Sequence, residues 1–280
     1  MVARTLRTVK VGFWLGWQIQ SNWTDPFLFF IYSLARPLGG TFILVFMFYV
    51  VAGGRRGAML DFFVVGAALW PTVVAALMGL AYGVLEDREH FKTTQYIYTA
   101  PIPFWAYLVG RGLASTVIGL PATILTLAVA IGILRIPVAL PVDRLPYFLA
   151  ALTLGVVGLL AVGMAIVGSL FIVSGEAWRM PEAVGQALYL LCGAIFPVTV
   201  LPNWLEPVAR ALPITYWLEA MRRAVLSPDA VRSFPAYSDL AVLGLLAAVS
   251  AIWIGAATLA FLGGLTRARQ QGILDASSTF

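Results

Sequence analysis

Long apolar stretches alternate with short polar ones along this chain. Six of them reach the length of about 20 mostly apolar residues that crosses a bilayer: 27–51, 59–85, 106–134, 147–174, 183–201 and 240–265. Lipid offers the backbone no hydrogen-bond partners, so each stretch is predicted to be a helix. The predicted fold is an all-α integral membrane protein whose six transmembrane helices form a single transmembrane domain over 1–280.

The first 22 residues predict an amphipathic helix that lies on the membrane surface. Apolar side chains recur there at helical spacing, at Val2, Leu6, Val9, Phe13 and Trp17. Arg4 and Arg7 lie on the other side, as in helices that rest at the lipid headgroups. We therefore expect 1–22 to be an interfacial elbow helix, the alternative being a frayed, positively charged leader.

Prolines and glycines inside the predicted spans indicate where helices bend or approach closely. Three spans contain a proline, which removes a backbone donor and tends to kink a helix: Pro71, Pro121 and Pro197. Small residues allow close helix contacts in lipid, and they occur at Gly79, Gly83, Gly155, Gly158, Gly163 and Gly168. Ordinary bundle packing accounts for most of them.

The stretch 202–226 predicts two short amphipathic helices separated by Pro213, on the extracellular side. It carries too many charges for the bilayer centre, and its Trp and Tyr residues are typical of the interface. Glu206 precedes Arg210, and Glu219 precedes Arg222 and Arg223, in the favoured order for helix ion pairs. We expect interfacial or re-entrant helices that act either as anchors or as a lid formed by Pro202, Trp204, Pro213, Tyr216, Glu219 and Arg222.

Composition supports the membrane interpretation and excludes several functions. The 280 residues are 61% hydrophobic and only 11% charged, against about 25% charged in soluble domains. The net charge of +5 is spread over loops, so nucleic-acid binding is not expected. The single cysteine, Cys192, cannot form a disulfide within the chain, and no metal site is expected.

The sequence also lacks the residues of a self-sufficient pump or enzyme. Its only histidine, His90, lies in a polar connection rather than in a span. Asp61, Arg36 and Arg111 lie near predicted helix ends, where long side chains reach the headgroups. No phosphate-binding loop is present. We therefore expect no catalytic residues and no cofactor in this chain, and a pump would need an ATPase on another chain.

The most polar connection, 86–103, lies between the second and third predicted spans and reads EDREHFKTTQYIYTAPIP. Three acids, Glu86, Asp87 and Glu89, open it; a solvated face is the simple interpretation, and a carboxylate cation site is the alternative. The segment resembles the E-R-E-x-G-T-L-E-x-L-L-x-[ST]-P segment of ABC-2 permeases. The run LPNWLEPVARALPITYWLEAMRR, 201–223, resembles a second stretch of that family, which precedes its last span.

The resemblance implies a short cytoplasmic coupling helix, from Arg88 to Tyr98, that fits a groove on an ATP-binding-cassette ATPase. The residues expected to couple the two proteins are Glu86, Arg88, Glu89, Phe91, Lys92, Thr93, Gln95, Tyr96 and Pro101. Lys92 and Gln95 stand where the family often has Gly and Glu. The resemblance further implies two ATPase copies, which bind ATP and Mg²⁺, and a second permease that is identical or paralogous.

We therefore expect the chain to be an exporter subunit in the cell membrane with both termini in the cytoplasm. The positive-inside rule supports this orientation only slightly. Hydrophobic or amphipathic drugs or lipids are the expected substrates, with lipid-linked polysaccharide as the alternative. Aromatic residues of the spans are candidates for the path: Phe46, Trp70, Tyr82 and Tyr189. A secondary carrier, a channel or a membrane-embedded enzyme are the remaining hypotheses.

Overall fold

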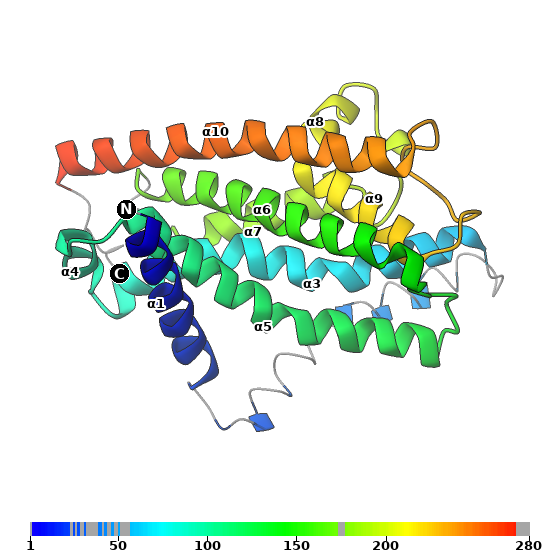
Figure 1. The fold of residues 1–280 in the computed structure, drawn as a ribbon, viewed down its shortest axis with the longest axis horizontal. Coiled ribbons are helices and arrows are strands. Elements are labelled where there is room, and N and C mark those ends of the chain that lie inside the picture. Colours follow the sequence, from blue (N-terminus) through cyan, green and yellow to red (C-terminus); the bar gives the residue numbers. More distant parts are fainter. Residues whose placement is uncertain are drawn as a thin grey trace.

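The computed structural model describes residues 2–22, 25, 27–28, 31, 39–40, 42–43, 46–47, 50, 57–172 and 177–272. Within these ranges the chain forms helices joined by turns and loops, and it contains no strand. Four helices are long and apolar enough to cross a membrane: α3 (Ala58–Leu85), α5 (Phe104–Gly132), α6 (Leu145–Leu170) and α10 (Asp239–Gln271). They run side by side along the long axis of the molecule (Figure 1).

These four helices confirm long apolar helices at the predicted spans 59–85, 106–134, 147–174 and 240–265, of which residues 173 and 174 lie outside the described ranges. Most of the predicted span 27–51 lies outside the described residues, and the described ones from Phe27 to Val50 are helical. The prediction of one helix over 183–201 is wrong. Helix α7 (Arg179–Leu191) has only 13 residues. Gly193 then adopts a left-handed φ of 72°, and Pro197 precedes the short 3-10 turn η3 (Val198–Val200), so the backbone cannot continue as a helix.

The two short helices predicted in 202–226 are confirmed as α8 (Glu206–Arg210) and α9 (Pro213–Val225), and Pro213 begins the second. The expectation that Trp and Tyr in α9 face an interface is wrong. Tyr216 and Trp217 are only 6% and 1% exposed. Helix α9 packs against α6, α10 and α3, which makes it part of the interior rather than a helix laid over it.

Glycines explain how α6 fits among its neighbours. A Cβ atom added at Gly155 would lie 1.7 Å from Trp217 of α9, and one at Gly163 would lie 2.8 Å from Leu80 of α3. At the far end of α6, the backbones of Gly168 and Gly264 cross, and a Cβ at Gly264 would lie 2.0 Å from the carbonyl oxygen of Gly168. The predicted packing role of these small residues is confirmed, since larger residues would separate the helices.

Helices α3 and α5 form a second close pair. A Cβ at Gly79 would lie 2.2 Å from that of Ser115, and the hydroxyl groups of Thr72 and Thr123 are 2.8 Å apart, within hydrogen-bond distance. Pro71 and Pro121 lie inside these two helices, which continue through them.

The N-terminal helix α1 (Val2–Ser21) crosses α5 (Figure 1). Its buried face consists of Thr8, Gly12 and Gly16 rather than of the predicted apolar stripe. Val2 and Leu6 are 74% and 64% exposed. The helix over 1–22 is thus confirmed, whereas its place at the membrane surface stays a prediction.

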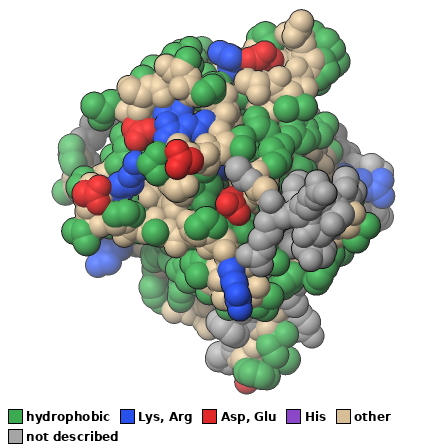
Figure 2. Space-filling view, turned by 90° about the vertical axis from the view of Figure 1, so that its right-hand side faces the viewer, with side chains coloured by type: hydrophobic (Ala, Val, Ile, Leu, Met, Phe, Trp, Pro, Cys, Tyr) green, Lys and Arg blue, Asp and Glu red, His purple; other side chains and the backbone are tan. Residues whose placement is uncertain are grey.

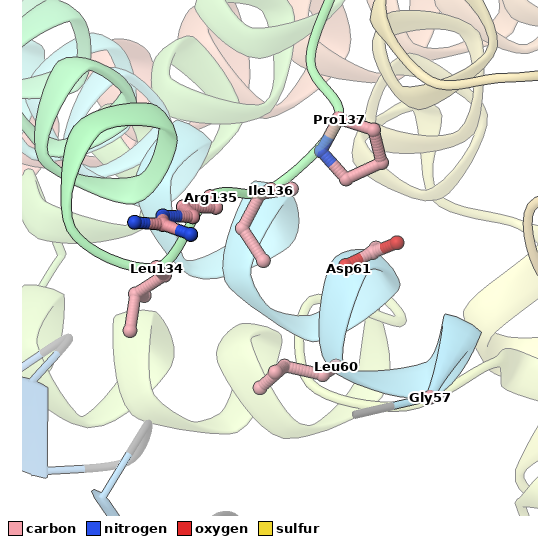
Figure 3. Close-up of a pocket in the computed structure, with 7 residues that line it drawn as sticks. All are labelled: Gly57, Leu60, Asp61, Leu134, Arg135, Ile136 and Pro137. Atoms are coloured by element: carbon pink, nitrogen blue, oxygen red, sulfur yellow. The ribbon is translucent and has the colours of Figure 1, made fainter. Parts of the chain in front are cut away.

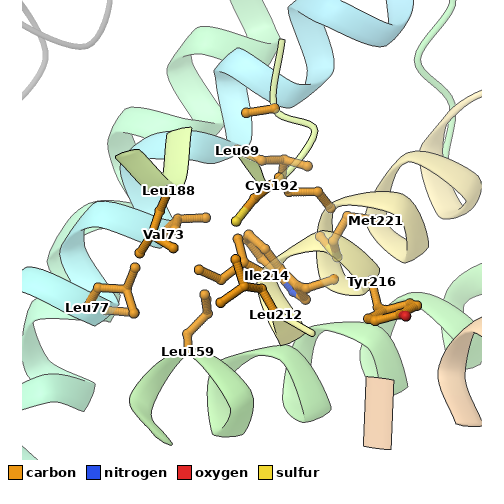
Figure 4. Packing of buried hydrophobic residues seen from close by; sticks show 14 of the residues in the cluster. Leu69, Val73, Leu77, Leu159, Leu188, Cys192, Leu212, Ile214, Tyr216 and Met221 are labelled. Carbon is orange, nitrogen blue, oxygen red and sulfur yellow. The ribbon is translucent and has the colours of Figure 1, made fainter. Parts of the chain in front are cut away.

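The largest apolar core lies where α3, α6, α7 and α9 meet. Its side chains include Leu69 and Leu77 of α3, Leu159 of α6 and Met221 of α9, and the buried Cys192 thiol lies among them (Figure 4). This core fixes the middle of the bundle, and two groups of charged side chains lie away from it.

Candidate functional site

The polar connection after α3 does not form the continuous helix predicted from Arg88 to Tyr98. Helix α3 runs into a π-helical turn, η1 (Glu86–His90), and a separate helix, α4 (Thr94–Thr99), follows. Lys92 between them has a left-handed φ of 52°, which a helix does not contain. In Figure 1, α4 lies at the same end of the bundle as the start of α1 and the end of α10.

Arg111 of α5 is the centre of a buried network at this end. Its side chain is fully buried, and its Nη1 lies 2.8 Å from Asp87 Oδ1 while Nη2 lies 2.9 Å from Glu86 Oε2. The Tyr107 hydroxyl accepts a hydrogen bond from Arg111 Nη1 at 3.1 Å and donates one to Asp87 Oδ2 at 2.9 Å. One guanidinium group therefore joins α5 to two acids of η1.

Arg88 and Glu89 connect η1 to α6 and to the start of α7. Arg88 is buried; its Nη1 donates to the carbonyl oxygen of Leu170, at the end of α6, at 3.3 Å, and its Nη2 lies 2.9 Å from Glu89 Oε1. The indole N–H of Trp178 donates to the other oxygen of Glu89. We define the buried network by these residues: Glu86, Asp87, Arg88, Glu89, Tyr107, Arg111 and Trp178.

The expectation that Arg111 reaches the headgroups is wrong, because its charge is paired inside the bundle. Gly83 of α3 lies beside Arg111: a Cβ there would be in ordinary contact with the guanidinium nitrogens, at 3.4 Å. Sequence reasoning named Asp87 as part of a solvated face or a cation site rather than as a buried partner of Arg111, and it missed Tyr107 and Trp178. The available signal was an acidic cluster at the end of one span and a lone arginine in the first turns of the next, which suggests a pair.

The coupling residues expected from the resemblance divide into two groups. Glu86, Arg88 and Glu89 face inward, in the network, and Thr93 is half-buried. The side chain of Gln95 lies outside the described residues. The others form the α4 surface, which we define as the exposed residues Phe91, Lys92, Tyr96 and Pro101.

Tyr96 is the most prominent residue of the α4 surface, at 75% exposed, and Phe91 is 43% exposed. Tyr98 turns the other way. Its ring packs edge-on against Phe104 of α5, and the guanidinium carbon of Arg269, on α10, lies 4.8 Å above it. Helix α4 is thus held to α5 and α10 on one side and exposes a tyrosine on the other.

A second charged group holds α9 in place near the opposite end. Arg222 donates to the carbonyl oxygens of Phe62, Gly193 and Ala194 at 2.8–3.0 Å, and it covers the Phe62 ring at 3.6 Å. Arg223 pairs with Glu219 at 2.8 Å and with Asp239 of α10 at 3.1 Å. Figure 2 views that end, where basic and acidic side chains lie close together among hydrophobic ones.

Of the residues predicted to form a lid, two are exposed and four are buried. Pro202 and Trp204 are exposed, Trp204 at 73%. Pro213, Tyr216, Glu219 and Arg222 are buried in the bundle. The predicted ion pairs of Arg210 with Glu206, at 2.5 Å, and of Arg223 with Glu219 are confirmed. Arg222 donates to backbone carbonyl oxygens instead.

Three of the aromatic residues proposed for a path pack between α3 and α7. The rings of Trp70 and Tyr189 are 4.6 Å apart, and Tyr82 stacks on Trp178 at 6.0 Å. Phe46, the fourth, is 63% exposed. The structure brings the first two together and places Tyr82 beside the buried network.

Two open pockets lie at opposite ends of the bundle. The smaller, of about 350 Å³, is lined by Asp61, Arg135 and five other residues, and Figure 3 shows the Arg135 side chain pointing away from Asp61. The larger, of about 580 Å³, lies between α1, η1 and α5. Across the described ranges, no three His, Cys, Asp or Glu side chains are placed to hold a metal ion.

The fold and the network define the class of protein: a helical membrane protein with several candidate spans, in which two groups of paired charges lie near opposite ends of the bundle. The family model described as "ABC-2 type transporter" matches residues 11–226. Because the match covers most of the chain, the protein belongs to the ABC-2 type transporter family and is a membrane-spanning permease component. A search of curated proteins finds no match.

Proposed function

We propose that this chain is the permease subunit of an ATP-driven ABC exporter and that the α4 surface contacts a separate ATPase. The exposed Tyr96, on a short helix held from behind by the contacts of Tyr98 with Phe104 and Arg269, is the observation that carries the proposal. An exposed aromatic side chain offers a large apolar area and a polar hydroxyl, which suits a protein interface. Movement of the ATPase would reach the bundle through η1.

The buried network gives such a movement a physical route. A displacement of α4 acts on η1, and η1 is joined to α5 through Arg111 and to α6 through the contact of Arg88 with the Leu170 carbonyl. Coupling requires two states that differ in these contacts. In this proposal Glu86, Arg88 and Glu89 transmit force, whereas Phe91, Lys92, Tyr96 and Pro101 touch the partner, with Thr93 and Gln95 at their border.

The complete exporter in this proposal contains two copies of the ATPase, which bind ATP and Mg²⁺, and a second permease, identical or paralogous. It lies in the cell membrane with the α4 end in the cytoplasm, so both termini are cytoplasmic. The cargo is a hydrophobic or amphipathic drug or lipid. Lipid-linked polysaccharide carried by the same machinery is the second candidate.

We expect Tyr96→Ala to reduce ATP-dependent export by at least about tenfold, since it removes a central aromatic contact worth 2 kcal/mol or more at an interface. Because the side chain is exposed, the variant should insert and fold normally. The measurement is substrate efflux from inverted vesicles, together with the abundance of the chain.

Tyr237→Ala is the matched control, because Tyr237 is also exposed, at 40%, but follows α9 rather than η1. Glu89→Lys is not a suitable probe, since it would break the contacts of Glu89 with Arg88 and Trp178 inside the bundle. Unchanged export by Tyr96→Ala at normal abundance would contradict the proposed contact.

The partner itself is tested by purifying the tagged chain from native membranes in gentle detergent. We expect an ATPase with a phosphate-binding loop to copurify, and the Tyr96→Ala variant to retain less of it. The same preparation shows whether a second permease is present. Recovery of the chain alone, combined with substrate flux in liposomes without an ATPase, would favour a secondary carrier or channel instead.

A further inference from the structure

The larger pocket combines a long apolar wall with one partly exposed acid. Its lining consists of Ile19, Gln20, Glu86, His90, Phe91, Ile118 and Trp178. Its volume of about 580 Å³ lies within the usual range for small-molecule sites. Ile118 follows Arg111 by seven residues on α5, or about 10 Å along the helix, so the pocket extends from the charged end into the apolar part of the bundle.

The acids of the buried network differ in what remains available to a ligand. The side chains of Asp87 and Glu89 are 6% and 11% exposed, and their oxygens are engaged by Tyr107 and Arg111 and by Arg88 and Trp178. The Glu86 side chain is 30% exposed and lines the pocket. Glu86 is therefore the acid that a bound molecule would meet.

The charge of the network favours a cation at this position. Two guanidinium groups face three carboxylates, so acidic side chains outnumber arginines by one and the network has an excess of negative charge when all of them are ionised; His90 lines the same pocket. Lys92, the nearest lysine in sequence, does not line the pocket. An anionic headgroup would meet this excess charge unfavourably, whereas an ammonium group gains an ion pair in a partly desolvated place.

The remaining walls suit a flat apolar body. The Trp178 indole N–H is used by Glu89 and its ring stacks on Tyr82 at 6.0 Å, so Trp178 offers the pocket only its remaining ring surface. Phe91 adds a second aromatic side chain, and Ile19 and Ile118 add aliphatic surface from two other helices. Aromatic faces also attract cations directly.

We propose that this pocket binds amphipathic organic cations, with the positive group beside Glu86 and the apolar body against Trp178, Phe91 and Ile118. As a site for transported cargo the pocket rests on the proposed exporter function, but binding itself needs neither the ATPase nor ATP. A ligand there would also touch η1, the turn that carries the network.

The test is fluorescence anisotropy of two dyes with one xanthene scaffold, cationic rhodamine 123 and anionic fluorescein, added to the full chain in phosphatidylcholine nanodiscs. We expect saturable binding of rhodamine 123 and at least tenfold weaker binding of fluorescein, empty nanodiscs being the background. Glu86→Gln keeps an oxygen for Arg111 and should weaken rhodamine 123 binding about tenfold, which corresponds to 1.4 kcal/mol. Asp143→Asn is the matched control, because it removes an exposed acid at the other end of the bundle.

A second variant, Ile118→Trp, fills the apolar wall without a change of charge and should abolish saturable binding. Each variant is compared with the unmodified chain in thermal unfolding, so that a folding defect is recognised. Equal rhodamine 123 affinity in Glu86→Gln and the unmodified chain, or equal binding of the two dyes, would overturn the site. Dye binding without ATP-dependent export would instead contradict the exporter proposal and leave the site standing.

Discussion

Replacing Arg111 with leucine is expected to lower the free energy of unfolding by about 3–5 kcal/mol, the usual cost of removing one partner from a buried ion pair. The side chain of Arg111 is fully buried, and its loss leaves Asp87 and part of Glu86 without a counter-charge. The Tyr107 hydroxyl loses one hydrogen bond as well. The measurement is the unfolding equilibrium in mixed micelles, followed as SDS is added.

A double substitution separates the loss of the pair from the loss of packing. In the Arg111→Leu background, Asp87→Asn removes the buried charge and should recover part of the lost stability, whereas Asp87→Asn alone should be destabilising. Such coupling is expected only for residues in direct contact. Arg267→Leu, at an exposed position of α10, controls for the change of residue type. Additive effects of Arg111→Leu and Asp87→Asn would contradict the network.

Hydrophobic pattern alone located most of the long helices. Stretches 59–85, 106–134, 147–174 and 240–265 needed only length and apolar composition, and the helices α3, α5, α6 and α10 follow them closely. The break at Pro213 was equally local, because proline favours the first turn of a helix. These features depend on residues that are close together in the chain, so they can be predicted from a single sequence.

The errors concern features that depend on distant residues. Stretch 183–201 is apolar enough for a span, yet Gly193 and Pro197 interrupt it, and Arg222 of α9 binds the carbonyl groups exposed at the break. Helix α9 is polar in sequence but buried, because its charges find partners on α10 and in the loops. The hydrophobic pattern of a sequence reports how polar each segment is. It does not show which polar groups find hydrogen-bond partners in the fold.

In the candidate site, too, the local features were predicted and the contacts between distant residues were not. The resemblance marked the segment 86–103, but it placed all of its charges on a surface. The structure turns Glu86 and Asp87 toward Arg111, which lies 24 residues or more away along the chain. Among the members of the predicted set whose side chains the structure describes, those that remain exposed are Phe91, Lys92, Tyr96 and Pro101. The segment thus has an inner face that holds the helices together and an outer face that is exposed.

The crossing of α6 and α10 lies near the same end of the bundle, so the network depends on it. Arg88 bonds to the carbonyl of Leu170, two residues after Gly168, where the two helix backbones meet. A change in this crossing would move the end of α6 and with it the acceptor for Arg88. The close contact between the two glycines therefore helps to position the carbonyl group to which Arg88 donates.

We expect Gly264→Leu to destabilise the chain by roughly 3 kcal/mol, the upper part of the usual range for overpacking. A Cβ at Gly264 would lie 2.0 Å from the Gly168 carbonyl oxygen. This neighbour is backbone, so no side-chain rotation relieves the overlap, and α10 must move away from α6. Thermal unfolding and protease resistance of the detergent-solubilised chain measure the effect.

Gly263→Leu is the matched control, because it makes the same substitution one residue earlier in the same helix. A Cβ at Gly263 meets no atom within 4 Å among the described residues. Leucine also favours a helix over glycine by about 1 kcal/mol, so this control should be neutral or slightly stabilising. Equal losses for Gly263→Leu and Gly264→Leu would show that the two backbones do not cross as the structure has them, and the support of the network by that crossing would fail with it.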